Sequence, residues 1–119
     1  MQVESMLEQI KANPKDVSFE EVMSVISEHY DYQPVLFTNG ITGDQVVNKA
    51  GENEGSCKIF AFAKLHELSE SETLACFGKY YRNDVLQNEE GDDHANIRTF
   101  IRHGWKGIAF EQPALVAKG

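Results

Sequence analysis

Residues 48–68 read NKAGENEGSCKIFAFAKLHEL, and this stretch decides the fold. Its first part, residues 48–56, is polar and contains Asn, Gly and Glu, whereas residues 57–68 form the most apolar segment of the chain. The length of that segment and its two alanines favour a helix over a strand, because alanine has the highest helix propensity. A helix that is apolar on nearly all sides is buried, so we predict that residues 57–68 run through the centre of the domain.

Helical periodicity also covers the chain before this stretch. Residues 1–13 place their apolar side chains on one helical stripe, and Pro14 ends the pattern because a proline disfavours the α region for the residue before it. Ser18 and Glu21 have the spacing of a capping box, in which each side chain bonds to the backbone N–H of the other residue. We therefore predict a second helix over residues 19–30.

Two further helices are predicted after the central one. Ser69 and Glu72 repeat the capping-box spacing and begin a helix whose apolar stripe continues to Val85. One aspartate of the pair 92–93 is placed to cap the last helix. Gly104 is placed to end that helix, since a left-handed conformation costs glycine little.

A few short segments are predicted to be extended. Residues 36–38 and 108–110 are suited to pair with each other. Asn39-Gly40 is a strong turn signal because both residue types tolerate positive φ, and a second turn signal follows at residues 42–44 (TGD). Residues 111–119 are predicted to form a C-terminal tail. The predicted fold is mainly α: a single compact domain of about five helices that leaves room for a minor two-stranded β pairing.

The composition bounds the domain count and the classes of partner. A chain of 119 residues matches one domain, residues 1–119, with a core large enough to need no disulfide. The formal net charge is −8, from 11 Lys and Arg against 19 Asp and Glu. A nucleic-acid partner requires a clustered basic face, and anionic membranes repel an acidic protein, so we expect neither partner. No apolar run approaches the roughly 20 residues of a membrane span.

The N-terminus and the cysteines predict a cytoplasmic protein. The first ten residues contain Glu4 and Glu8 and lack the basic and apolar regions of a secretory signal. Without such a signal, Cys57 and Cys76 are expected to stay reduced rather than to form a disulfide.

The polar loop at 48–56 opens the predicted central helix and is the first candidate site. Helix N-termini bind anions and lower the pKa of nearby thiols, so Cys57 can be a reactive thiolate or part of a small-anion site. In the alternative interpretation, Ser56 caps the helix and Cys57 is a small core residue. The candidate ligand-binding residues of this loop are Asn48, Asn53 and Ser56.

The second candidate site is the sequence DHANIR at residues 93–98. His94 and Arg98 lie four residues apart, and therefore on one helix face. Polar donors gathered in this segment can bind a carboxylate or a phosphate, and the candidate ligand-binding residues here are Asn96 and Arg98. Alternatively, these residues form a solvated helix face, or Arg98 pairs with the acidic residues 89–90. We assign no catalytic residue, but Cys57 and His94 are candidates for a nucleophile and its base, with Asn53 or Asn96 in support.

The sequence predicts no metal and no cofactor. The four histidines show no HExxH spacing, the two cysteines form no CxxC pair, and neither a Walker loop nor GxGxxG occurs.

Five segments together carry a resemblance to a known family. They are residues 37–40 (FTNG), 48–58 (NKAGENEGSCK), 76–81 (CFGKYY), 93–98 (DHANIR) and 104–108 (GWKGI). The chain resembles the HopJ family of type III effector-like proteins from residue 19 to residue 110. The resemblance implies no reaction, cofactor or catalytic residue.

Three functions follow from the residues and the resemblance. The first is an effector-like protein that acts by binding a protein partner or a small acidic ligand, with export into a host cell as a further expectation. The second is a small cysteine-dependent enzyme that uses Cys57 with His94. The third is a bacterial housekeeping domain that carries an inherited effector label.

Overall fold

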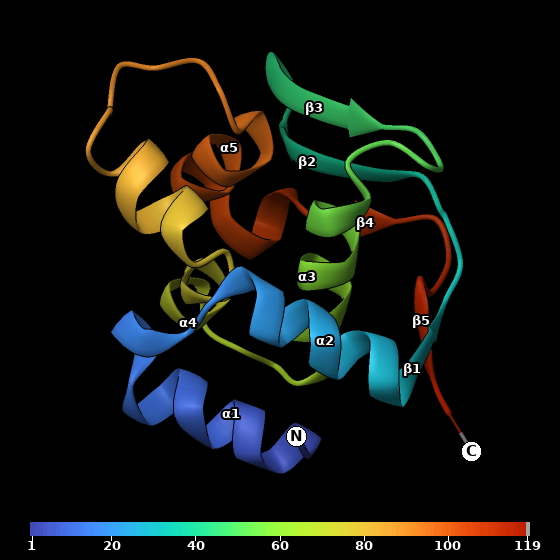
Figure 1. The fold of residues 1–119 in the computed structure, drawn as a ribbon. Coiled ribbons are helices and arrows are strands. Elements are labelled where there is room, and N and C mark those ends of the chain that lie inside the picture. The colour runs from blue at the N-terminus through green and yellow to red at the C-terminus, as the bar shows by residue number, and fades with distance from the viewer. Residues whose placement is uncertain (119) are drawn as a thin grey trace.

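The structure is a computed structural model that describes residues 1–118. Helices are grouped around a central one, and two small antiparallel sheets cover part of the outside (Figure 1). The α-helices are α1 (Val3–Ala12), α2 (Phe19–His29), α3 (Glu54–Leu65), α4 (Glu70–Ala75) and α5 (Ala95–His103). The strands are β1 (Tyr30–Tyr32), β2 (Phe37–Ile41), β3 (Asp44–Asn48), β4 (Ala109–Phe110) and β5 (Leu115–Ala117).

Helix α3 lies in the middle of the molecule, as the sequence predicts (Figure 1). Its residues 59–63 are all buried, and Phe60 is fully inaccessible to solvent. The ring centroid of Phe60 lies 5.0 Å from that of Phe100 in α5 and 5.4 Å from that of Phe77. Burial of each such ring contributes roughly 1.5–3 kcal/mol, so α3 connects the packing of the other helices into one core.

Both predicted N-cap serines begin a helix, and one of the two predicted capping boxes is complete. Ser18 Oγ accepts a hydrogen bond from the backbone N–H of Glu21 at 3.1 Å at the start of α2. Ser69 and Glu72 form the complete reciprocal box at the start of α4. These starts follow from local chemistry, since each cap involves residues only three positions apart.

The predicted helix over residues 70–85 is divided in two. Helix α4 ends at Ala75, and Gly78 has a φ of +58°, which interrupts the helix before a π-helical turn at Tyr80–Val85. A Cβ atom on Gly78 would lie 2.8 Å from the backbone nitrogen of Phe19. The close approach of α2 therefore requires glycine at this break.

The turn predicted at Asn39-Gly40 is wrong. Strands β2 and β3 pair from Phe37 opposite Asn48 to Ile41 opposite Asp44, so their turn lies at residues 42–43. Asn39 instead lies within β2 with a fully buried side chain. The predicted contact between residues 36–38 and 108–110 is confirmed, since Phe37 pairs with Phe110 and Thr38 with Ala109.

The predicted C-terminal tail is part of the fold. Strand β5 pairs with β1, with Leu115 opposite Tyr32, and both Ala114 and Leu115 are buried. Five strands in two sheets make the architecture mixed α/β rather than mainly α. The strands have only two to five residues, too few for a strong two-residue periodicity in the sequence.

Candidate functional site

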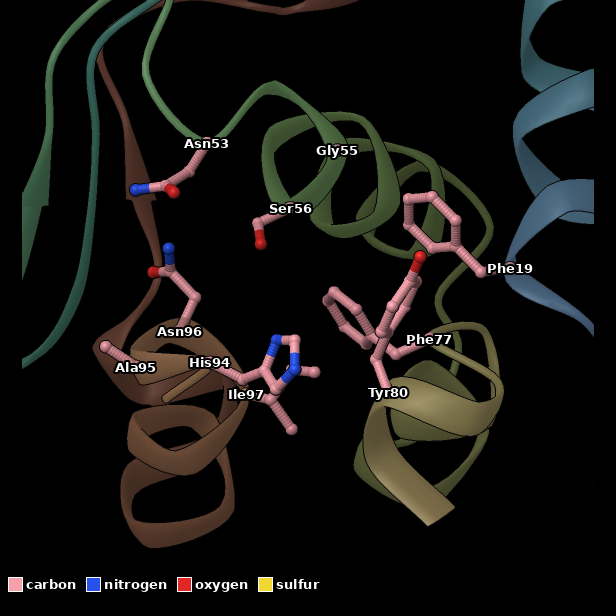
Figure 2. Close-up of a pocket in the computed structure, with 10 residues that line it drawn as sticks. All are labelled: Phe19, Asn53, Gly55, Ser56, Phe77, Tyr80, His94, Ala95, Asn96 and Ile97. Atoms are coloured by element: carbon pink, nitrogen blue, oxygen red, sulfur yellow. The ribbon is translucent and has the colours of Figure 1, made fainter. Parts of the chain in front are cut away.

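A cleft of about 400 Å³ opens between the first turns of α3 and α5 (Figure 2). Its polar side consists of Asn53, Gly55, Ser56, His94, Ala95 and Asn96. Its apolar side consists of Phe19, Phe77, Tyr80 and Ile97. The two candidate segments of the sequence, 48–56 and 93–98, thus meet in one cleft.

The N-termini of α3 and α5 both border this cleft. The first hydrogen bonds within the two helices run from the N–H of Cys57 to Asn53 O and from the N–H of Arg98 to His94 O. The N–H groups of residues 54–56 and 95–97 therefore have no acceptor within their own helices. These donors give the cleft a partial positive potential on two sides.

The caps of these helices differ from the predicted ones. Ser56 does not cap α3, which begins two residues earlier after Asn53, and neither aspartate at 92–93 caps α5. The N-cap residues are Asn53 and His94, with φ values of 50° and 51°, and neither side chain caps its own helix. Left-handed backbone at a residue other than glycine costs of order 1–3 kcal/mol and is concentrated at functional sites. Two of the three such residues in the described chain border this cleft.

A network of asparagine amides holds the two helix starts together. Asn96 Nδ2 donates to Asn48 Oδ1 at 2.9 Å, and Asn48 Nδ2 donates back to Asn96 Oδ1 at 3.1 Å. Asn53 Nδ2 donates to the same Asn48 oxygen at 2.7 Å. Asn39 Nδ2 donates to the Asn96 backbone carbonyl at 2.8 Å. The geometry of the cleft therefore depends on these four side chains.

The network separates the predicted ligand-binding asparagines into two groups. Asn53 and Asn96 line the cleft, whereas Asn48 is fully buried behind it and uses its amide to hold them. Asn39 was missed because an Asn-Gly pair favours a turn. The one available signal was Phe37, an apolar residue two positions earlier and therefore on the same face of an extended strand.

His94 projects its ring between the two sides of the cleft (Figure 2). Its Nε2 lies 3.0 Å from Asp84 Oδ2, and its ring centroid lies 5.4 Å from that of Tyr80. These contacts fix the ring and leave Nδ1 without a hydrogen-bond partner among residues 1–118. No signal in the sequence points to Asp84, because no motif connects it with a histidine ten residues later.

Arg98 lies outside the cleft. Its side chain is 9% exposed, and its guanidinium donates to the backbone carbonyls of Asn88, Glu89 and Asp93. It also forms an ion pair of 2.6 Å with the Asp93 carboxylate and thereby lowers the pKa of Asp93. Arg98 therefore holds the acidic loop before α5. This role resembles the alternative interpretation of the sequence, in which Arg98 pairs with residues 89–90.

Cys57 also lies outside the cleft. Its side chain is 1% exposed in the core, and burial raises the pKa of its thiol. That direction is opposite to the shift that activates a nucleophilic cysteine. The neighbouring residue on the cleft wall is Ser56, whose hydroxyl points into the space above His94 (Figure 2). The structure thus brings His94 together with Ser56 and not with Cys57.

The described residues show neither a metal site nor a membrane-spanning helix. Residues 1–118 contain no group of three or more His, Cys, Asp or Glu side chains arranged to hold a metal ion. Within the same range, every helix is too short or too polar to cross a membrane.

Comparison with known proteins identifies the family. The family described as "HopJ type III effector protein" matches residues 3–115, which is nearly the whole chain. The chain belongs to the HopJ family. This HopJ-family fold is similar to that in the "Crystal structure of unknown function protein VPA0580", with 48% sequence identity and a TM-score of 0.94 over 99% of this chain and 95% of that one. No curated protein matches the chain.

Proposed function

We propose that this HopJ-family protein binds a small anionic ligand, a carboxylate or a phosphate, in the cleft between α3 and α5. The convergence of two helix N-termini on one cleft carries the proposal. Each N-terminus offers backbone donors aimed outward and a partial positive charge, the arrangement that binds anions in many proteins. The volume of about 400 Å³ lies within the range of small-molecule sites.

The donors in the cleft suit an anion of low charge. No Lys or Arg lines the cleft, so the attraction comes from backbone N–H groups, the Ser56 hydroxyl and the His94 ring. One helix N-terminus contributes typically 0.3–1 kcal/mol to the binding of a negative charge. Two N-termini together contribute about 2 kcal/mol at most, so we expect dissociation constants on the order of tens of millimolar or weaker for inorganic phosphate or acetate alone.

Substitution of Ser56 by Asp tests the proposal. An aspartate in the first turn of a helix stabilises the helix, so Ser56→Asp is expected to fold while its carboxylate repels a bound anion. Ser71 is exposed in the first turn of α4 and does not line the cleft, so Ser71→Asp gives the matched control. Both variants change the net charge equally.

The measurement is the binding of phosphate and of acetate, followed by the amide NMR shifts of Gly55 and Ala95. Chloride at the same ionic strength serves as the reference. The wild type and Ser71→Asp are expected to saturate with the same dissociation constant, and Ser56→Asp is expected not to respond. Equal responses to phosphate, acetate and chloride in the wild type would refute the proposal.

The family name carries a second proposal, export through a type III system. Residues 1–30 contain α1 and α2, and Met6 and Ile10 of α1 are fully buried against the rest of the domain. Export would require this segment to detach. A reporter fused to residues 1–30 and expressed in a type III-competent bacterium is expected to leave the cell. Retention of the fusion in the cell, with an established effector exported in parallel, would remove the proposal.

A further inference from the structure

The cleft has an aromatic side that a simple inorganic anion would leave uncovered. Phe19 and Tyr80 meet edge to face, with ring centroids 5.2 Å apart and planes at 82°. The His94 ring follows Tyr80 at 5.4 Å, so three rings form a continuous wall opposite Ser56 (Figure 2). Phe19 and Tyr80 both remain partly exposed to solvent.

Gly55 allows the aromatic wall to lie close to the polar side of the cleft. A Cβ atom on Gly55, in the first turn of α3, would lie 3.0 Å from Phe19 Cζ. Such a contact is tighter than almost all real Cβ contacts, so a side chain at residue 55 would push the phenyl ring away. Glycine at residue 55 therefore allows the Phe19 ring to lie beside the free N–H groups at the start of α3.

We infer that the ligand is amphipathic: a small organic acid that carries an aromatic ring or an apolar group of similar size. The inference rests on the proposed function, because the acid group takes the place of the anion at the starts of α3 and α5. The ring then lies against Tyr80 and Phe19. The cleft volume of about 400 Å³ leaves room for both parts of such a molecule.

The apolar wall predicts a definite order of affinities. Removal of one benzene ring from water favours binding by on the order of 10- to 100-fold over the same acid without the ring. Benzoate is therefore expected to bind at least about tenfold more tightly than acetate. Benzyl alcohol has the ring without the charge and is expected to bind more weakly than benzoate.

Two variants of Tyr80 distinguish the contribution of its ring to binding from that of its hydroxyl group. Tyr80→Ala is expected to reduce the benzoate preference to below about threefold and to leave the acetate dissociation constant within about twofold. Tyr80→Phe keeps the ring and is expected to keep the preference. Phe19→Leu provides a second variant that retains packing at the start of α2 and is expected to lower the preference partially.

NMR titration of the full chain with benzoate, acetate and benzyl alcohol gives both affinity and location. Support requires the tenfold preference, its loss in Tyr80→Ala and amide shifts at Gly55 and Ala95. Equal affinities for benzoate and acetate, with shifts at those amides, would overturn this inference and leave the proposed function intact. Benzoate shifts centred on Leu65 and Leu115, which line a separate groove, would also overturn it. The absence of binding by either acid would refute the proposed function itself.

Discussion

The side-chain amides of Asn48 and Asn96 hydrogen bond to each other in both directions, at 3.1 and 2.9 Å, although 48 residues separate them. The pair joins the end of β3 to the first turn of α5. Because Asn53 also donates to Asn48, the same pair fixes the start of α3. The relative position of the two helix N-termini therefore depends on one buried amide pair.

Removal of one amide of this pair is expected to destabilise the whole domain. In Asn48→Ala, the buried amide of Asn96 loses both of its hydrogen bonds to Asn48, and the exposed Asn53 loses its bond to the same side chain. A buried polar group without a partner costs about 1–3 kcal/mol, so we expect the free energy of unfolding to fall by about 2–4 kcal/mol. Urea unfolding measures the change, with Asn83→Ala at an exposed position as the control. A difference of less than about 0.5 kcal/mol between the variants would show that the network is dispensable.

We expect that the ammonium group of a lysine cannot replace the guanidinium of Arg98 in stabilising the fold. Arg98→Lys keeps the charge but cannot reach the carbonyls of Asn88 and Glu89 and the Asp93 carboxylate together. We expect a loss of about 2–3 kcal/mol in unfolding free energy and faster hydrogen exchange in residues 86–93. Arg102→Lys, at a side chain that is 50% exposed, is expected to cost less than about 1 kcal/mol. Similar losses in the two variants would contradict this role for Arg98.

The contact between Asp44 and α5 is expected to weaken in acid. Hydrogen bonds from Arg102 and His103 lower the pKa of Asp44 to about 2 from its ordinary value of 3.8. A carboxyl group whose pKa is lower in the folded state stabilises the fold above its unfolded pKa. That contribution disappears as the pH falls from about 4 to about 2.

Melting temperatures between pH 6 and pH 2 test this contact. Asp44→Asn is expected to lower the melting temperature at pH 6 and to flatten its decline below pH 4, whereas Asp92→Asn at an exposed position is expected to follow the wild type. Parallel curves for all three proteins would show that the Asp44 contact contributes nothing.

Both cysteines are expected to react slowly in the folded protein. Burial raises the pKa of Cys57, and it raises the pKa of Cys76 to about 12. Iodoacetamide at pH 7.5 is therefore expected to modify neither thiol until the protein is unfolded in guanidinium. Mass spectrometry of digested samples measures the two rates. Fast labelling of Cys57 alone, slowed by His94→Ala, would restore the cysteine-dependent enzyme as a candidate.

The separation between predictable and unpredictable features follows the range of the interactions. The N-caps at Ser18 and Ser69 involve neighbours three residues apart, and both were predicted correctly. The turn at Asn39-Gly40 was predicted from the same local rules and is wrong, because the Asn39 amide bonds to Asn96. A buried partner 57 residues away outweighs the preference of an Asn-Gly pair for a turn.

The candidate site shows the same division at the level of single side chains. The sequence identified the two polar segments, 48–56 and 93–98. It did not indicate which residues in each segment face the cleft. The N-cap of α3 is Asn53 rather than the predicted Ser56, so Ser56 and Cys57 both lie within the helix. The side chains of neighbouring helical residues point about 100° apart. The start of the helix therefore decides that Ser56 faces the cleft and Cys57 the core. Similarly, the carbonyls of the loop before α5 turn Arg98 away from the cleft.

The sequence by itself determined that an apolar helix occupies the centre of the domain, and it determined where several of the helices begin. These features depend on periodicity and on caps that a few consecutive residues encode. Only the tertiary structure decided the mixed α/β architecture, the docking of residues 115–117 as a strand, and the meeting of two helix N-termini at one cleft. Each of these requires hydrogen bonds between residues far apart in the chain, and a pattern of single residues does not specify such partners.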